Sequence, residues 1–369
     1  MNSLCSAFWK TIALTCGIFL ITACQSETPA MTPAEVQRVA NLTDRMTTRC
    51  IGRYLIDLPE QFILNSSSIT KIEGVSIEAT PMSRTDFDAR LQRRKAALER
   101  ETIDAEETPS LTEIRKLPEG VGLVFNRSRT GSSAALRAWE LVSWSNNVSL
   151  TMTIESTNTT LSNYAYPEDQ KRDDVEERLV RLFDLYKRTR PRSDTEIPAE
   201  PGVCFANGFV QGPPTDEEWV DMNHHWQGVP DVYFSFNSNS SIGPEDDTLL
   251  QRHKVEEALA REGGKTLRKG TRNVNGLIFE EWLMQRLSQQ WKDMMLYDMN
   301  AEMNSQAGNA ERPLLFFSLV SGVKHPRPQP TLEQAATEKP LEGATLNAAE
   351  TIALWDRVSS TLRIRPGAF

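Results

Sequence analysis

Apolar residues recur at every second position in two stretches of the chain. In residues 148–155, Val, Leu, Met and Ile alternate with Ser, Thr and Glu. Successive side chains of a strand point to opposite faces, so this pattern predicts a strand with one buried face. Residues 295–303 alternate in the same way, with methionine at several of the apolar positions. We interpret these methionines as core side chains rather than as metal ligands.

Other stretches repeat their apolar residues every three or four positions, as one face of an α-helix does. Residues 175–186 follow this spacing, and residues 352–362 form a similar stripe near the C-terminus. Asn347 and Glu350, three positions apart, have the spacing of a capping box that begins this last helix. Shorter apolar patterns predict further helices over residues 33–41, 87–98 and 249–261.

The chain contains an internal duplication. Cys50 and Cys204 open similar segments, and Gly122–Phe125 recurs at the same offset as Gly276–Phe279. Three weaker matches keep the same order: Leu91–Lys95 with Leu250–Lys254, Ile114–Lys116 with Leu267–Lys269, and Arg190-Pro191 with Arg365-Pro366. Two units of one fold explain this common order. Each unit has the pattern strands, helix, strands, helix, which predicts an α+β fold of two tandem, internally duplicated domains, each an antiparallel sheet with packed helices.

These patterns divide the chain into five segments. We expect a lipoprotein signal peptide at residues 1–23, a tether at 24–46, an N-terminal α+β domain at 47–192, a linker at 193–201 and a C-terminal α+β domain at 202–369. Within the last segment, residues 323–345 carry several prolines and predict a long surface loop before the final helix.

The N-terminal segment has the layout of a bacterial lipoprotein signal. Lys10 precedes a short apolar run over residues 11–23, and Cys24 follows small residues at the expected cut. A membrane-spanning helix needs about 20 apolar residues, so we interpret the run as a cleaved signal with Cys24 as the lipidated first residue. An ordinary secretion signal or a short signal anchor is the alternative. The mature protein is then expected in the periplasm, where disulfides form.

Cysteine usage depends on this location. Of the five cysteines, Cys5 and Cys16 leave with the signal and Cys24 carries the lipid. Cys50 and Cys204 remain. In an oxidising compartment they either form a disulfide or lie separately buried as small apolar side chains, and the sequence leaves both alternatives open.

The chain is acidic, with a formal net charge of −9 at pH 7. Nucleic acids and anionic lipids attract proteins with positive surface fields, so this charge argues against general binding to either. The same charge is compatible with a basic protein partner.

The sequence lacks the motifs of common catalytic and metal sites. It has no Gly-x-Ser-x-Gly, no Cys-x-x-Cys and no His-Glu-x-x-His. Gly263–Thr266 resembles the end of a phosphate loop without its first glycine, and we interpret it as a helix stop before a strand. Of the histidines, His224 and His225 are adjacent and chelate poorly, His253 takes an exposed helix position, and His325 lies in the proline-bearing loop. We therefore predict a binding protein rather than an enzyme, with no catalytic residues, cofactor or metal site.

Aromatic side chains provide the candidate contacts with a partner. Trp219 and Trp226 flank His224 and His225 in a stretch without clear periodicity. Tryptophan is enriched in binding hot spots, so these four residues are the candidates. The alternative is that both tryptophans cap the second core. Four other tryptophans lie in predicted strands, and we expect them in the core: Trp139, Trp144, Trp282 and Trp291.

The openings of the two units carry a resemblance to a known family. Residues Cys50–Pro59 read Cys-Ile-Gly-Arg-Tyr-Leu-Ile-Asp-Leu-Pro, and residues Gly202–Val210 open the second unit with Gly-Val-Cys-Phe-Ala-Asn-Gly-Phe-Val. With these segments the chain resembles two-domain immunity proteins that are cognate to phospholipase effectors of the type VI secretion system. The likeness runs from about Thr47 to Pro366 and rests on structural motifs, because the family offers no catalytic residues to transfer.

The resemblance implies a periplasmic lipoprotein that binds and neutralises a phospholipase effector. Two domains that contact the effector together would act as a stoichiometric clamp over its active site or opening. A lipid on Cys24 would hold the inhibitor at the membrane that the toxin attacks. Gln25 is not the aspartate associated with inner-membrane retention, which favours the outer membrane. The alternatives are an envelope lipoprotein that binds another protein or a lipid, a hydrolase of unfamiliar layout, and a purely structural lipoprotein.

Overall fold

The fold is known from a computed structural model, which describes residues 29–65, 67–103, 108–129, 133–161, 166–244, 247–288, 294–304, 308–324 and 341–369. The expected signal peptide, Cys24, Trp291 and His325 lie outside the described residues, as does most of the proline-bearing segment.

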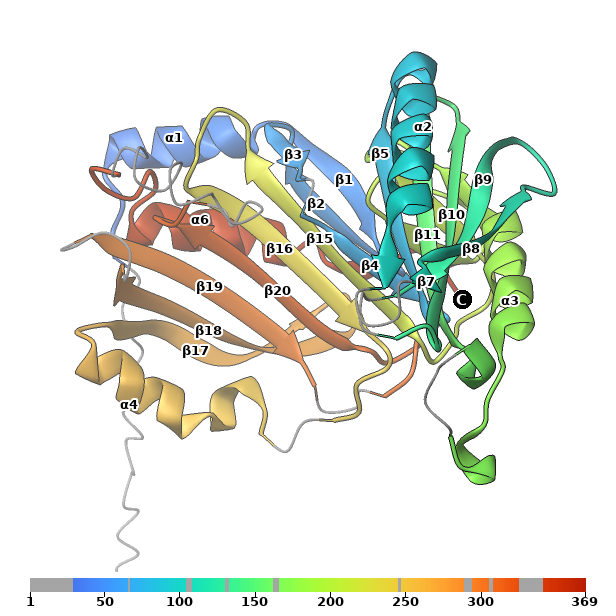
Figure 1. The fold of residues 1–369 in the computed structure, drawn as a ribbon. Coiled ribbons are helices and arrows are strands. Elements are labelled where there is room, and N and C mark those ends of the chain that lie inside the picture. The colour runs from blue at the N-terminus through green and yellow to red at the C-terminus, as the bar shows by residue number, and fades with distance from the viewer. Residues whose placement is uncertain are drawn as a thin grey trace, which may run out of the picture.

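Helices and antiparallel strands make up the described chain, and the predicted α+β class is confirmed (Figure 1). The helices are α1 (Pro33–Thr43), α2 (Arg84–Arg100), α3 (Val175–Arg188), α4 (His253–Arg261) and α6 (Ala348–Ser359). Short 3-10 turns are η1 (Thr159–Leu161), η2 (Glu168–Gln170) and η3 (Leu249–Gln251). Within the described residues, no helix is both long and apolar enough to cross a membrane.

Most strands belong to one large sheet. Its strands from the first half are β3 (Phe62–Leu64), β4 (Ile69–Ile72), β5 (Val75–Pro81), β8 (Leu111–Lys116), β9 (Val121–Ser128), β10 (Leu136–Ser145) and β11 (Val148–Thr157). Its strands from the second half are β15 (Glu218–Trp226), β16 (Val232–Asn239), β17 (Lys265–Val274), β18 (Leu277–Leu287), β19 (Met295–Met303) and β20 (Leu314–Ser321). A separate two-stranded ladder joins β6 (Thr102–Ile103) to β7 (Thr108–Pro109).

The strand order of the large sheet reveals an approximate two-fold relation between the halves. The first half runs β8-β9-β10-β11-β5-β4 and the second runs β17-β18-β19-β20-β16-β15, so each strand has a counterpart. The two halves join where β4 pairs with β15 through Lys71↔Trp219 and neighbouring positions. The duplication inferred from sequence is therefore visible as two copies of one sheet topology, joined edge to edge.

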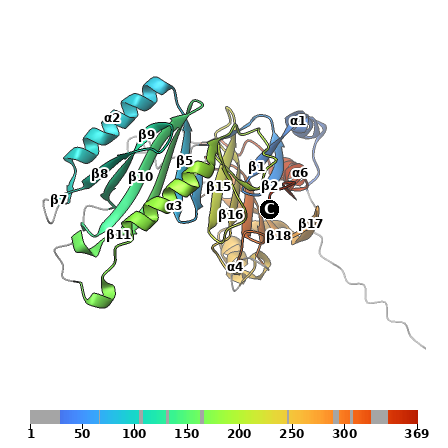
Figure 2. The ribbon, with the colours of Figure 1, turned by 90° about the vertical axis from the view of Figure 1, so that its right-hand side faces the viewer.

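Helices cover the two faces of this sheet differently. On one face, Leu179 and Leu182 of α3 pack with Trp139 of β10, in the same core that includes Trp355 of α6. On the opposite face, Phe87 of α2 packs in a smaller, separate cluster, and α4 contributes to another such cluster. Figure 2 shows α2 and α3 on opposite sides of the first half of the sheet.

Two small sheets exchange strands between the halves. The hairpin β1 (Met46–Ile51) and β2 (Tyr54–Pro59) pairs with β21 (Arg363–Ile364), which follows α6 at the C-terminal end. The hairpin β13 (Gly202–Phe205) and β14 (Gly208–Gln211) pairs with β12 (Thr189–Pro191), which follows α3. Each half thus completes the small sheet of the other.

The predicted elements mostly form where the patterns place them. Residues 148–155 lie in β11, residues 295–303 are β19, and residues 175–186 lie in α3. Asn347 and Glu350 form both hydrogen bonds of the expected capping box. Gly263 has the left-handed φ of +76° that a helix stop needs, and β17 begins two residues later.

Two details of the sequence interpretation are wrong. The helix predicted over residues 249–261 is interrupted, because η3 ends at Gln251 and α4 begins only at His253. The match of Arg190-Pro191 with Arg365-Pro366 is displaced, because β12 and β21 are the equivalent strands. The true counterparts are Arg192 and Arg365, whose backbone N–H groups donate to the turns of the two exchanged hairpins.

Candidate functional site

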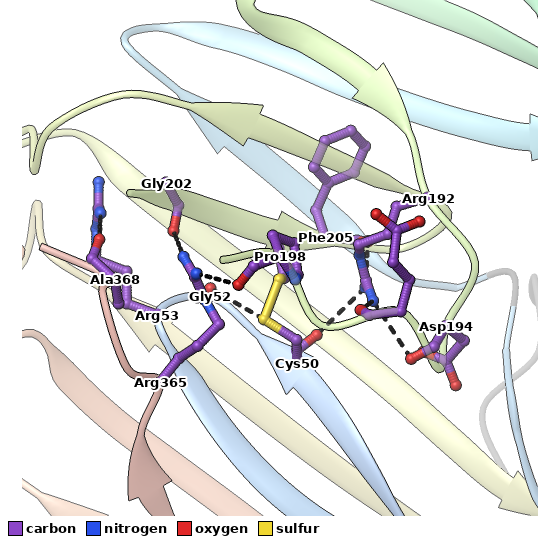
Figure 3. Close-up of a disulfide and its surroundings, with 12 residues drawn as sticks. Cys50, Gly52, Arg53, Arg192, Asp194, Pro198, Gly202, Phe205, Arg365 and Ala368 are labelled. Atoms are coloured by element: carbon purple, nitrogen blue, oxygen red, sulfur yellow. Dashed lines mark hydrogen bonds between the residues drawn. A yellow bond between two sulfur atoms is a disulfide. The ribbon is translucent and has the colours of Figure 1, made fainter. Parts of the chain in front are cut away.

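A disulfide lies where the hairpin β1–β2 meets the hairpin β13–β14 (Figure 3). We call this place the junction, and we call these two hairpins the exchanged hairpins because each pairs with a strand from the other half. Cys50 of β1 and Cys204 of β13 are bonded at an S–S distance of 2.02 Å, with Cα atoms 5.7 Å apart and no solvent exposure. Beside it, Gly52 and Cys204 exchange two backbone hydrogen bonds of 2.8 Å each. Of the two alternatives that the sequence left open, the structure has the bonded pair, and the bond joins the two halves covalently.

Two equivalent arginines are buried on either side of this disulfide. The guanidinium of Arg192 donates to the carbonyls of Cys50 and Phe205 at 3.3 and 3.2 Å. The guanidinium of Arg365 donates to Pro198 and Gly202 at 2.7 Å each. Burial lowers the pKa of Arg192 to about 10 and also lowers the pKa of Arg365. Each guanidinium therefore donates its hydrogen bonds to backbone carbonyls of the junction rather than to a ligand.

A buried ion pair connects the first hairpin to the large sheet. Arg53, in the turn after β1, donates to Glu218 at the start of β15 at 2.9 and 2.7 Å. Both side chains are almost fully buried. Arg53 also donates to the carbonyl of Ala368 and lies over the ring of Phe369. The contacts of Arg53 thus hold the hairpin β1–β2, the strand β15 and the last residues of the chain together.

His224 belongs to a buried cluster and is not available to a partner. Its Nε2 lies 3.2 Å from Asp194 Oδ2, which Arg49 also contacts at 3.1 Å, and the imidazole has no solvent exposure. Burial alone would raise the pKa of Asp194, but the hydrogen bond and charge of His224 and the charge of Arg49 lower it. The expected contact through His224 is therefore corrected: the residue anchors Asp194 of the predicted linker.

The other candidate contacts are divided between the two faces of β15. Trp226 is partly buried against the main core, on the face of His224. Trp219 and His225 lie on the opposite face and are half-buried. The indole N–H of Trp219 is buried without an acceptor among the described residues. The four residues thus form no single patch.

The face of Trp219 also carries two polar motifs that sequence reasoning missed. Asp221 accepts from Asn223 at 2.9 Å on β15, and Asp298 accepts from Asn300 at 3.0 Å on β19. Burial raises the pKa of Asp221 and of Asp298. The signal was present, since both motifs read Asp-Met-Asn in strands with alternating burial.

Nothing in the described part of the chain resembles a metal centre. No three histidine, cysteine, aspartate or glutamate side chains gather there in a way that could hold an ion. The geometry instead consists of buried clusters that fix the two halves against each other. Between α2 and α4, Figure 1 shows a strip of the large sheet that no described helix covers.

Comparison with known proteins identifies two family domains in order along the chain. Residues 47–192 match the Tle cognate immunity protein 4 N-terminal domain, and residues 196–367 match the Tle cognate immunity protein 4 C-terminal domain. No curated protein matches in sequence.

Solved structures share the arrangement over most of the chain. A chain of the crystal structure of the Tle4-Tli4 complex is 20% identical with a TM-score of 0.65, covering 87% of this chain and 98% of that one. The apo structure of the immunity protein TplEi of the type VI secretion system from Pseudomonas aeruginosa is 22% identical with a TM-score of 0.61, covering 87% and 97%. TplEi complexed with an "L" peptide is 21% identical, with a TM-score of 0.58 and coverage of 87% and 98%.

Proposed function

The chain belongs to the family of two-domain immunity proteins cognate to the Tle effectors of type VI secretion, and we propose that it binds one phospholipase effector stoichiometrically and silences it. The observation that carries this proposal is the match of both family domains, in order, over nearly the whole described chain. Inhibition would come from binding alone, without catalysis by this chain.

We propose a clamp in which both halves contact the effector and cover its active site or its opening. The rigid junction supports this mode, because the disulfide, the exchanged hairpins and the Arg53–Glu218 pair hold the halves at one angle. A preorganised pair of surfaces loses less entropy on binding, and the second contact becomes nearly intramolecular. The solved complex of one relative with Tle4 supports a protein partner.

The proposed location is the periplasm, with a lipid on Cys24 as the anchor and the inner leaflet of the outer membrane as the address. The support is the signal-like pattern of residues 11–24 and the glutamine at position 25. A membrane-bound inhibitor would meet the effector at the surface that the effector attacks. Mass spectrometry of the mature protein from membranes tests this, since an acylated N-terminal Cys24 is expected and an unmodified N-terminus elsewhere contradicts it.

Calorimetry tests the partnership directly. Residues 25–369, with the disulfide formed, are titrated into the cognate phospholipase effector. Tight binding with a stoichiometry of one is expected. Absence of heat with a folded sample and an active phospholipase contradicts the proposal. Copurification of the isolated protein with lipid would then favour an envelope lipoprotein with another ligand.

A further inference from the structure

The two-fold relation between the halves breaks at one place. In the second half, β15 and β16 pair continuously from Trp219↔Asn239 to His225↔Tyr233. Their counterparts β4 and β5 pair only at Lys71↔Ser76 and Ile72↔Val75, beside a two-residue turn. β5 then runs on to Pro81 with β11 on its other edge. The edges of β5 and of β3–β4 therefore separate, and Figure 1 shows β5 beside α2 while β3 stays near β1.

A cavity of about 350 Å³ lies in this split. Leu64 and Thr70 line the wall formed by β3 and β4, and Ile77 and Ala79 line the wall formed by β5. Phe205 at the end of β13 and the turn residues Ala206 and Asn207 also line the cavity. The volume lies within the range of about 300–1,000 Å³ that is typical of binding pockets.

The backbone of β5 turns its hydrogen-bonding groups into the split. Val75 faces Ile72 across the two-residue turn, so the alternation of a strand directs the N–H and C=O of Ile77 and Ala79 to the same edge. The amide of Asn207 donates to the carbonyl of Ala79 at 2.9 Å, which fixes that direction. Among the described residues, ladder pairing between β4 and β5 ends at Lys71↔Ser76. Apart from the bond from Asn207, no described strand pairs with β5 along this edge beyond Ser76, and an effector segment that added there would take the place of the Asn207 amide at Ala79. An unpaired strand edge of this kind can pair with another extended segment.

We propose that an extended segment of the cognate effector adds as a strand to β5 in this split. This inference rests on the proposed function, because it names where on this chain the effector docks. Side chains on one face of the segment would meet Ile77 and Phe205, which favours apolar residues there. Side chains on the other face would meet Glu78, an exposed carboxylate that Arg90 contacts only at 3.9 Å, on a chain of net charge −9, which favours basic residues. The occupant is thus an alternating apolar and basic strand.

The substitution Ala79→Pro tests the proposal. Proline removes the N–H that faces the split but leaves the β5–β11 ladder, whose bonds come from the neighbouring residues. The matched control is Thr271→Pro, because the same alternation directs the N–H of Thr271 to the solvent side of the edge strand β17. We expect Ala79→Pro to weaken effector binding by about tenfold or more, and Thr271→Pro to bind like the wild type.

Hydrogen exchange of the wild-type complex gives a second measurement that needs no variant. The amides of Ile77 and Ala79 are expected to become protected when the effector binds. Undiminished binding by a folded Ala79→Pro variant, or a complex without protection in β5, overturns the strand addition and leaves the proposed function standing. Failure of the wild-type protein to bind the effector overturns both.

Discussion

Single residues at the junction carry charges that the fold has to neutralise. Arg53 and Glu218 form the most deeply buried of these pairs, and Asp194 is held between Arg49 and His224. Removing one partner of a buried pair leaves the other charge buried without a counter-charge, which lowers stability far more than the loss of an exposed pair does. The residues that fix the geometry of the two halves are therefore polar as well as apolar.

Replacing Glu218 with alanine is expected to lower the free energy of unfolding by about 3–5 kcal/mol, because Arg53 stays buried without its carboxylate. Urea unfolding followed by circular dichroism measures the change. The control is Glu60→Ala, which removes an exposed partner of Arg45 and should change stability by less than about 1 kcal/mol. Equal effects of the two substitutions would contradict the assigned role of the buried pair.

The lowered pKa of Asp194 predicts a defined dependence of stability on pH. A carboxyl with a depressed folded-state pKa stabilises the fold above its unfolded-state pKa of about 4, and this stabilisation disappears as the pH falls through the folded-state value. Asp194→Asn should therefore be less stable than the wild type at pH 7. The difference should shrink in unfolding curves recorded below about pH 4. A difference that grows in acid would show that the cause lies elsewhere.

At the scale of single residues, the sequence identified the cysteine pair but not the environment of His224. The two cysteines that follow the expected signal segment could be singled out by counting, and the structure bonds them. The burial of His224 and its contact with Asp194 could not be inferred, because Asp194 lies in the segment interpreted as a linker. Adjacent histidines in a strand point to opposite faces, but sequence does not reveal which face is buried.

At the scale of elements, local periodicity was sufficient for most helices and strands. The capping box of α6 illustrates why, since Asn347 and Glu350 satisfy the first turn through neighbours three residues apart. The interruption before α4 was missed because the backbone of Arg252 leaves the helical region without a glycine or proline to signal it. Signals that act over a few residues can be recognised, whereas deviations without a distinctive residue type cannot.

Asn347→Ala is expected to reduce the free energy of unfolding by about 1 kcal/mol, because a helix N-terminus loses its side-chain acceptor. The effect should register in global unfolding, since α6 packs Trp355 into the main core. Thr32→Ala removes the corresponding cap of α1, a helix that packs mainly against α6. Global unfolding should respond less to that change, and a larger response would contradict the peripheral role of α1.

At the scale of the whole molecule, the duplication was recognisable but its assembly was not. The matched segments predicted two units of one fold, and the strand order bears this out. The pairing of β2 with β21 and of β12 with β14 joins segments whose local patterns contain no information about the partner. Edge-to-edge joining through β4 and β15 is hidden for the same reason, because register between distant strands is set by packing.

The disulfide is expected to stabilise the whole molecule, because it closes a loop of more than a hundred residues between the halves. Replacing Cys50 and Cys204 together with alanine should cost about 2–5 kcal/mol in free energy of unfolding. Reductant should destabilise the wild type by a similar amount and leave the double variant unchanged. A double variant as stable as the oxidised wild type would contradict a role for the bond in holding the halves together.

The central claim is stoichiometric silencing of a phospholipase effector by this chain, and an activity titration tests it most directly. The concentration of the cognate effector is held well above the dissociation constant, and its hydrolysis of phospholipid vesicles is followed as inhibitor is added. The account predicts a linear loss of activity that ends at one equivalent. Full activity at several equivalents of folded, disulfide-bonded protein would contradict it.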